Sequence, residues 1–160
     1  MKSKLRQMSP DDLEHQGELT EGWFIYTIKQ LELGLRAPLE QATQGAGLTT
    51  AQFTALAVLS RWPGLTSSEL ARRSFVRAQT MAQTIAPLLS SGYIHRQDDP
   101  ANGRKMRLSL TPEGLTALDS IRGSVSSIEA DFLSGLLPQE RENFAAYMRA
   151  CRSTLDKLPR

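Results

Sequence analysis

Three cations stand within four residues of a strand-like segment, and their type and spacing suggest a chemical task. The segment reads "DDPANGRKMRLSLTPEG" (98–114), and its cations are Arg104, Lys105 and Arg107. Closely spaced cations on an exposed strand can neutralise the phosphates of a nucleic acid. The arginines that could extend such a surface come earlier in the chain, at Arg72, Arg73, Arg77 and Arg96.

The net charge of the chain, +2, hides an uneven distribution along the sequence. Residues 61–107 contain 8 Lys and Arg against 3 Asp and Glu, which gives this segment a net charge of +5. Residues 1–60 carry −2 and residues 108–160 carry −1. A basic middle between mildly acidic ends predicts that residues 61–107 face a polyanion.

No group of residues has the composition of an active site. Catalysis needs a nucleophile with a base, or paired carboxylates with shifted pKa values. The sequence has two distant histidines, scattered acids and no glycine-rich phosphate loop. We therefore predict no enzymatic activity, no metal site and no cofactor. The single cysteine, Cys151, cannot form an internal disulfide, and its place on an apolar helix face predicts a buried thiol.

The chain contains no run of about 20 apolar residues that could cross a membrane. Its polar N-terminal stretch lacks the apolar core of a secretory signal. We therefore expect a cytoplasmic protein without a membrane partner. A chain of 160 residues can also bury a core without disulfides or metals.

The elements that would position the cations are mainly helical. From Leu19, apolar residues at a spacing of three and four predict a first helix, which Pro38 should kink or end. Two further helices start with capping-box spacing, in which two side chains satisfy free backbone N–H groups. These pairs are Thr49 with Gln52, before a stop at "WPG" (62–64), and Thr66 with Glu69.

The next helix, over about residues 78–91, has a polar N-terminal half that reads "AQTMAQT". Its apolar residues Met81, Ile85, Leu88 and Leu89 point inward, which leaves Gln79, Thr80 and Gln83 outward. Such side chains can bind base edges in the major groove of DNA, and glutamine suits adenine. Arg77 precedes the helix and could contact a guanine or a phosphate, of which we favour the phosphate. The competing interpretation is that these residues only solvate an exposed helix face.

A β-hairpin should follow, with Gly92 as the residue after the helix end. "GYIHR" (92–96) reads as a strand, and "QDDPANG" (97–103) as its turn. The return strand alternates, which places Met106, Leu108 and Leu110 on the protein and Lys105, Arg107 and Ser109 outward. A small strand at Leu65–Thr66 could join the hairpin. The competing interpretation is that the hairpin charges only prevent edge-to-edge pairing.

Two long amphipathic helices complete the pattern. "TPEG" starts one of them, with Thr111 as N-cap and Pro112 as the first helical residue, and Pro138 starts the other. Together with the first helix they carry more apolar positions than one lobe can cover. They are therefore expected to form a base that is buried against a second copy of the chain.

This order of elements resembles the MarR (multiple-antibiotic-resistance regulator) family of winged helix-turn-helix regulators. The matching stretches are "LTTAQF", "LTSSELARRS", "TMAQTIAPLLSSGYIHR" and "DDPANGRKMRLSLTPEG". The resemblance implies a mainly α fold with a small β-hairpin wing. Residues 48–111 would form the DNA-binding lobe. Residues 19–47 and 112–160 would form a helical dimerisation region, and residues 1–18 a polar N-terminal arm.

The resemblance further implies a sequence-specific, double-stranded-DNA-binding transcriptional regulator. It would act as a ligand-responsive repressor and bind a palindromic operator as a homodimer. Arg104 would enter a minor groove, whose narrow interior attracts arginine, and Asp98 or Asp99 would orient a wing arginine. Two features depart from the family pattern: Arg77 replaces a small polar cap, and Pro87 should bend the recognition helix. The residues left to neutralise phosphates are Arg72, Arg73, Arg96, Lys105 and Arg107.

Family members often bind a small aromatic or phenolic effector in a cleft. Here its lining could come from Trp23, Phe24, Tyr26, Phe53 and Trp62, although ordinary core or surface positions also account for these residues. The alternative function is a winged-helix protein-interaction module without direct DNA binding. Such a module would need neither the basic middle of the chain nor the polar helix face.

Overall fold

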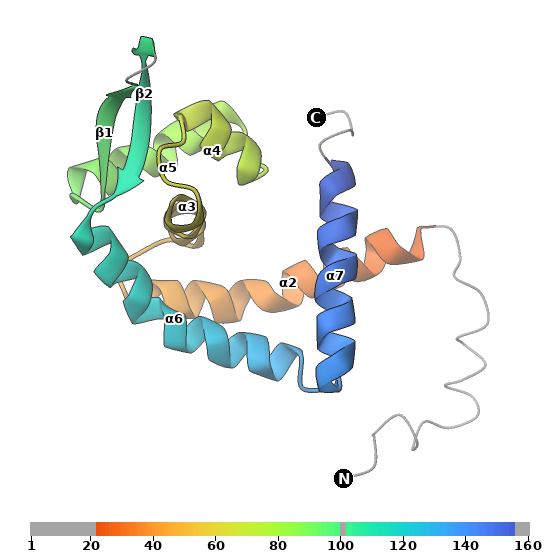
Figure 1. The fold of residues 1–160 in the computed structure, drawn as a ribbon. Helices are drawn as coiled ribbons and strands as arrows, with labels where there is room; N and C mark the ends of the chain where they lie inside the picture. Colours follow the sequence, from red (N-terminus) through yellow and green to blue (C-terminus); the bar gives the residue numbers. More distant parts are fainter. Residues whose placement is uncertain (1–21, 100–101, 156–160) are drawn as a thin grey trace, which may run out of the picture. The chain divides into compact units, whose positions relative to one another are not determined.

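The computed structural model describes residues 22–99 and 102–155, apart from the side chain of Arg104. The polar arm predicted for residues 1–18 lies outside this range. The elements are α2 (Trp23–Gln44), α3 (Thr50–Arg61), α4 (Ser67–Arg73), α5 (Ala78–Ser90), β1 (Ile94–Asp99), β2 (Asn102–Leu110), α6 (Pro112–Phe132) and α7 (Pro138–Leu155) (Figure 1). The mainly α chain with one β-hairpin is confirmed. None of the described helices has the length and apolar character of a membrane span.

The chain forms two compact units. Of the described residues, the central unit contains those from 31 to 126, and the terminal unit contains 22–30 and 127–155. The central unit includes all of the predicted lobe 48–111 together with parts of the flanking helices.

Both predicted capping boxes are present at the starts of α3 and α4. The Thr49 hydroxyl accepts a hydrogen bond from the Gln52 backbone N–H at 3.2 Å, and the Gln52 side chain accepts one from the Thr49 backbone N–H at 2.8 Å. Thr66 and Glu69 repeat this exchange at 3.3 and 2.8 Å. Each box satisfies backbone donors that a helix start leaves without a partner.

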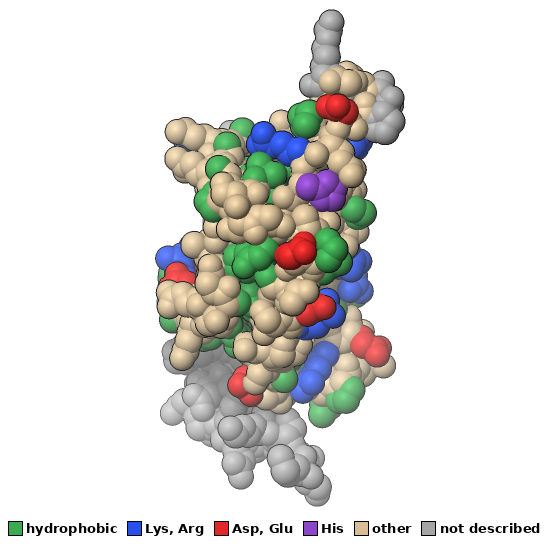
Figure 2. Space-filling model, turned by 90° about the vertical axis from the view of Figure 1, so that its left-hand side faces the viewer, with side chains coloured by type: hydrophobic (Ala, Val, Ile, Leu, Met, Phe, Trp, Pro, Cys, Tyr) green, Lys and Arg blue, Asp and Glu red, His purple; other side chains and the backbone are tan. Residues whose placement is uncertain are grey.

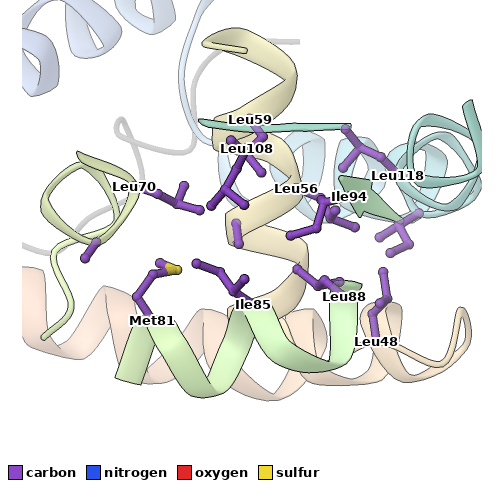
Figure 3. Close-up of a cluster of buried hydrophobic side chains, with 13 residues drawn as sticks. Leu48, Leu56, Leu59, Leu70, Met81, Ile85, Leu88, Ile94, Leu108 and Leu118 are labelled. Carbon is purple, nitrogen blue, oxygen red and sulfur yellow. The ribbon is translucent and has the colours of Figure 1, made fainter. Parts of the chain in front are cut away.

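One apolar core holds the central unit together (Figure 3). Leu56 of α3 is fully buried at its centre, and Ile85 of α5 points toward it. The other elements supply further buried side chains, which include Leu59, Leu70, Met81, Leu88, Ile94, Leu108 and Leu118. The inward face predicted for α5 is confirmed. Because this face packs against the core, the opposite face of α5 points outward and its orientation is fixed by that packing.

Two prolines lie inside helices without ending them. The helix α2 continues through Pro38 to Gln44, and α5 continues through Pro87 to Ser90. Pro87 is exposed and lies in the last turn but one of α5, next to the buried Leu88. Its missing backbone N–H therefore falls in the C-terminal part of α5, away from the polar half.

The hairpin differs from the prediction in its length and its turn. The strands pair antiparallel, with Asp98 opposite Met106 and, after an irregularity, Asp99 opposite Asn102. Residues 97–99 therefore belong to β1, and Asn102-Gly103 belongs to β2 instead of the turn. The irregularity absorbs the extra residues of β2, as a β-bulge does. A bridge from Leu65 to Leu108 confirms the small third strand.

Met106 was expected to anchor the hairpin, and this expectation was wrong. The Met106 side chain is 44% exposed, whereas Leu108, two residues further along β2, is 2% exposed. The core reaches Leu108 and does not extend to the level of Met106. The period-two pattern identified the correct strand face, but it could not show where the core ends along the strand.

A close junction joins the end of α5, the start of β1 and the start of α6. Gly92 has the positive φ, 70°, expected of the residue after a helix end. The Thr111 hydroxyl donates to the Gly92 carbonyl at 2.6 Å and accepts from the Gly114 N–H at 3.0 Å. A Cβ atom on Gly114 would overlap the Tyr93 carbonyl oxygen and lie 2.9 Å from its carbonyl carbon. Only glycine therefore fits at Gly114 without a backbone shift.

The terminal unit exposes much of its apolar surface. Not one side chain of α7 is buried, and Tyr147 and Met148 are 67% and 51% exposed. The rings of Phe132 and Phe144 contact each other, with centroids 6.3 Å apart. Cys151 is exposed in the single chain, so the prediction of a buried thiol was wrong for the chain by itself. The reason is that none of the described residues, 22–99 and 102–155, buries the apolar face of α7. In the part of α2 that belongs to the terminal unit, residues 23–30, the exposed large apolar residues are Trp23, Phe24, Ile25, Tyr26 and Ile28.

Candidate nucleic-acid interface

The exposed face of α5 has the side chains that base recognition needs. Gln79, Thr80 and Gln83 are exposed, whereas Met81 and Ile85 on the other face are buried. Arg77 is the N-cap of α5 and makes no side-chain capping bond, which leaves its guanidinium exposed at the helix start. Sequence reasoning missed the two small residues on this face, Ala82 and Ala86, which are also exposed and allow close approach of a ligand.

The segment around α5 contains no acidic residue. From Leu70 to Gln97 the sequence has neither Asp nor Glu, and this stretch includes the end of α4, all of α5 and most of β1. No carboxylate of the segment itself therefore repels a polyanion that approaches α5. The arginines of this stretch supply the attraction, and they are Arg72, Arg73, Arg77 and Arg96.

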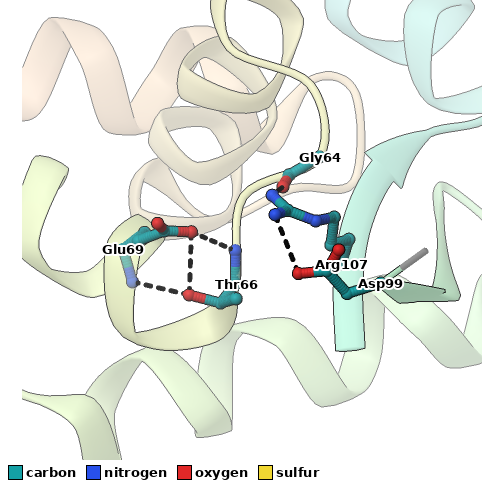
Figure 4. A network of polar contacts seen from close by, with 5 residues as sticks. All are labelled: Gly64, Thr66, Glu69, Asp99 and Arg107. Atoms are coloured by element: carbon teal, nitrogen blue, oxygen red, sulfur yellow. Dashed lines mark hydrogen bonds and ion pairs between the residues drawn. The ribbon is translucent and has the colours of Figure 1, made fainter. Parts of the chain in front are cut away.

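Arg107 connects the hairpin to the turn between α3 and α4 (Figure 4). Its guanidinium donates to the Asp99 carboxylate at 2.8 Å and to the Gly64 carbonyl at 2.7 Å. The hydrogen bond from Arg107 to Asp99 and the charge of Asp99 raise the pKa of the guanidinium. The Gly64 N–H also donates to the Leu108 carbonyl at 2.9 Å. The hairpin is therefore tied to the α3–α4 turn at two neighbouring residues.

This network changes two expectations about the wing. Arg107 was expected on the outward basic face as a phosphate contact; its side chain is 40% exposed, and its guanidinium also binds Asp99 and Gly64. The sequence left Asp98 and Asp99 open as the orienting acid. Asp99 is 5% exposed and binds Arg107, whereas Asp98 is exposed. The irregular register at Asp99 brings this carboxylate toward Arg107, and strict alternation along the strand could not anticipate it.

Two other cations of the hairpin lie on its surface. Lys105 of β2 and Arg96 of β1 are exposed, as is Arg72 of α4. Arg104 lies in β2, three residues before Arg107. On the face drawn in Figure 2, Lys and Arg side chains form separate groups, and Asp and Glu side chains lie among them.

The carboxylate of Glu69 stabilises the start of α4. Its pKa is lowered by hydrogen bonds from the Thr66 backbone N–H and hydroxyl, and the nearby charges of Arg107 and Arg72 lower it further. The carboxylate therefore contributes stability above the ordinary glutamate pKa, and this contribution is lost as the pH falls through the lowered value.

A Glu69→Gln substitution tests this pH dependence. At pH 7 we expect the variant to have a smaller free energy of unfolding than the wild type, because the charged acceptor of the capping box is lost. The difference should shrink as the pH falls from the ordinary glutamate pKa toward the lowered pKa of the folded protein, where the wild-type carboxylate becomes protonated. Urea unfolding of both proteins at several pH values measures this difference in the free energy of unfolding. A difference that stays constant across this range would contradict the assignment.

The structure shows what surrounds each of the aromatic residues proposed for an effector cleft. Trp62 lies beneath two guanidinium groups, with Arg61 at 5.3 Å and Arg73 at 4.4 Å from its ring centroid. Each contact has cation–π geometry. Trp23 and Tyr26 contact each other in α2, with ring centroids 5.8 Å apart. The remaining two residues are Phe53, which packs against the core of the central unit, and Phe24, which is exposed in the terminal unit.

Within the described ranges, 22–99 and 102–155, no three His, Cys, Asp or Glu side chains gather as a metal ion would require.

The two-helix unit α4–α5 with the following hairpin defines a winged helix-turn-helix protein. The sequence profile of the MarR family matches residues 46–105. The HTH-type transcriptional repressor Rv2887 of Mycobacterium tuberculosis is 32% identical over 122 residues, which cover 76% of this chain and 86% of that protein. The chain belongs to the MarR family of transcriptional regulators, and it is a regulator and not an enzyme.

Solved structures agree with this assignment. A MarR family regulator from Silicibacter pomeroyi superposes with a TM-score of 0.75 and 27% identity, over 84% of this chain and 91% of that chain. The Mycobacterium tuberculosis protein Rv2887, solved with salicylic acid, superposes with a TM-score of 0.65 and 27% identity. The two chains are covered to 84% and 97%.

Proposed function

We propose that this regulator is a sequence-specific DNA-binding repressor that binds a palindromic operator as a homodimer. The observation that carries the proposal is the exposed face of α5. Gln79, Thr80 and Gln83 stand on a helix whose other face is buried, inside a segment that contains no acid. A rigid helix with polar outward side chains suits the major groove, where each base pair has its own pattern of donors and acceptors. Its place of action would be the cytoplasm, where it meets DNA.

The proposed homodimer is supported by the terminal unit. Exposed apolar side chains on α7 and on the N-terminal half of α2, among them Tyr147 and Phe24, form more apolar surface than a monomer usually shows to water. A second copy of the same surface would cover it with twofold symmetry. That symmetry would present two α5 helices to half-sites whose centres are about 10 bp apart.

Selection from a pool of random duplexes tests this proposal. We expect the full-length protein to enrich an imperfect palindrome with two half-sites one helical turn apart. Binding should weaken with salt, because bound cations displace counterions from phosphates. A pool that stays random after repeated rounds, with no salt-dependent binding, would contradict DNA recognition. It would favour the alternative, a winged-helix module that binds another protein.

We propose that Arg104 enters the minor groove beside each half-site, and that Arg72, Arg73, Arg77, Arg96 and Lys105 contact phosphates. Arg104→Ala should weaken binding to the selected duplex by about 1–3 kcal/mol and lower the salt slope by about 1. Fluorescence anisotropy at several salt concentrations measures both quantities. Arg122→Ala is the matched control, since it removes one exposed charge from α6. Equal affinity of the wild type and Arg104→Ala would overturn the assignment of Arg104.

We further propose a small phenolic carboxylate as the effector class. The support comes from a relative, since Rv2887 has been solved in complexes with salicylic acid and p-aminosalicylic acid. Salicylate added at millimolar concentration to the protein–DNA complex should release the labelled duplex, whereas benzoate without the hydroxyl group should be weaker. Anisotropy that does not change under salicylate would exclude this effector class.

A further inference from the structure

One stripe of exposed side chains runs along α5 on the side opposite its buried face. The exposed residues follow the i, i+3, i+4, i+7 spacing of one helix face, and they are Gln79, Ala82, Gln83 and Ala86. The buried residues of α5 repeat this spacing two positions further along, at Met81, Thr84, Ile85 and Leu88. Two residues correspond to a rotation of about 200° around the helix axis. The exposed stripe therefore points directly away from the core.

The helix α5 contains no charged residue, which limits the bases that its stripe can bind. Its sequence, AQTMAQTIAPLLS, has neither Lys nor Arg, whose side chains make the commonest specific contacts with guanine. It also has neither Asp nor Glu, which accept a hydrogen bond from cytosine. The cation next to the helix, Arg77, is the N-cap and precedes the stripe. The stripe itself therefore lacks the charged contacts that select a G·C pair.

The two glutamines of the stripe match adenine better than the other bases. A glutamine amide has donor N–H groups beside an acceptor oxygen, and adenine presents the N7 acceptor beside the N6 donor. Guanine presents two acceptors in this place, and cytosine presents only a donor. Either base would leave one group of the amide without a partner, which weakens binding. Gln79 and Gln83 therefore favour adenine.

The two alanines of the stripe each present a methyl group. In the major groove, such a methyl group packs on the C5-methyl group of thymine. Alanine is also the best helix former, so its presence alone would assign no contact. Ala82, however, lies between the two glutamines in the stripe, and Ala86 extends the stripe by three residues. Because adenine pairs with thymine, the glutamines and the alanines select the same base pair.

The spacing of the glutamines fits neighbouring base pairs. Four residues of an α-helix rise by about 6 Å, and successive bases of a DNA strand are about 3.4 Å apart. The amides of Gln79 and Gln83 can therefore reach base pairs that are one or two steps apart. A short run of A·T pairs satisfies both amides and the alanine methyl groups beside them.

We propose that α5 recognises a short run of A·T pairs in each half-site of the operator. Gln79 and Gln83 bind adenines, and Ala82 and Ala86 pack on thymine methyl groups. This inference rests on the proposed DNA-binding function. It adds the base composition that the helix selects, and it assigns a part in this selection to the two alanines.

Selection from random duplexes with Gln83→Arg tests the base assignment. We expect the wild type to select A·T pairs where α5 contacts each half-site. Arginine binds O6 and N7 of guanine, so the variant should exchange one of these A·T pairs for a G·C pair and prefer it on the order of tenfold. The matched control is Gln97→Arg, which adds the same charge at an exposed position of β1. It should keep the base preference of the wild type.

Small chemical changes in the selected duplex identify the individual contacts. Replacing adenine with 7-deazaadenine removes the N7 acceptor, and replacing thymine with deoxyuridine removes the methyl group. One 7-deazaadenine position per half-site should weaken wild-type binding on the order of tenfold and leave the binding of Gln83→Ala unchanged. One deoxyuridine position should weaken the wild type and not Ala82→Gly. Comparing two duplexes with the same variant cancels any general loss that the substitution causes.

Two results would overturn this inference and leave the proposed function intact. One is a selected palindrome that tolerates every 7-deazaadenine and deoxyuridine replacement or has no A·T pair where α5 binds. The other is a Gln83→Arg protein that selects the same sequence as the wild type. If the wild type enriches no sequence at all, the proposed function itself fails. The failure of the inference is therefore distinguishable from the failure of the function.

Discussion

Glutamates placed at Tyr147 and Met148 are expected to dissociate the proposed homodimer and to remove specific operator binding. Both side chains are more than half exposed in the single chain, so the substitutions should leave the chain itself folded. In a dimer these positions would be buried, where unpaired carboxylates are strongly unfavourable. A monomer presents one α5 helix in place of two. The preference for the selected duplex should therefore fall about a thousandfold or more, toward non-specific affinity.

Sedimentation velocity measures whether the variant is a monomer or a dimer. Anisotropy titrations measure its affinity for the selected duplex. The control is Asn143→Glu, which places a carboxylate at an exposed polar position of the same helix α7. It should stay dimeric and keep its affinity for DNA. A Tyr147→Glu, Met148→Glu protein that remains dimeric would show that α7 does not form the interface.

A single methyl group at Gly114 is expected to destabilise the protein by up to about 2 kcal/mol. Alanine normally improves a helix over glycine by about 1 kcal/mol. At Gly114, however, the added Cβ would overlap the Tyr93 carbonyl oxygen and lie 3.0 Å from Leu110 Cδ2. Backbone shifts of this kind cost about 1–3 kcal/mol or more. They would also disturb the Thr111 hydroxyl, which holds Gly92 and Gly114 together.

Gly123→Ala provides a matched control in the same helix, because nothing lies within 4 Å of the position of its Cβ atom. This variant should be as stable as the wild type or more stable. Urea unfolding of the three proteins at the same protein concentration compares them. If Gly114→Ala is as stable as Gly123→Ala, the close approach of α6 to Tyr93 is not present in solution.

Local features of the fold were predictable from the sequence because they depend on neighbouring residues. The capping pairs Thr49–Gln52 and Thr66–Glu69 are three residues apart, and each helix begins where these pairs indicated. Gly92 ends α5 as expected, and Pro112 begins α6. In each case a short-range steric or hydrogen-bonding requirement selects the residue type.

The wing was less predictable because its register depends on contacts between distant residues. Turn-forming residue types from Gln97 to Gly103 do not fix where the chain reverses, and a shift of one residue turns every side chain to the other face. The bond from Arg107 to Gly64 joins residues 43 positions apart in the sequence. No periodicity along β2 indicates that partner, so the sequence could predict the strand face of Arg107 but not the two groups that bind its guanidinium.

Phe75 shows a different limit of sequence reasoning. The segment "SFVR" was recognisable as a turn, but the sequence does not state which of its residues has a positive φ. The structure places the positive φ at Phe75, directly after the C-cap of α4, where glycine is the usual residue. The polar face of α5 could be predicted because the buried residues Met81 and Ile85 determine which side remains outside.

The measurement that tests the central claim most directly is a pair of DNA titrations with one double variant. The wild type and Gln79→Ala, Gln83→Ala are each titrated with the selected duplex and with a scrambled duplex of the same composition at physiological salt. We predict that the wild type prefers the selected duplex by about a thousandfold or more. The variant should bind the scrambled duplex as the wild type does and lose most of that preference. Equal affinity of the wild type for both duplexes would contradict sequence-specific recognition through α5.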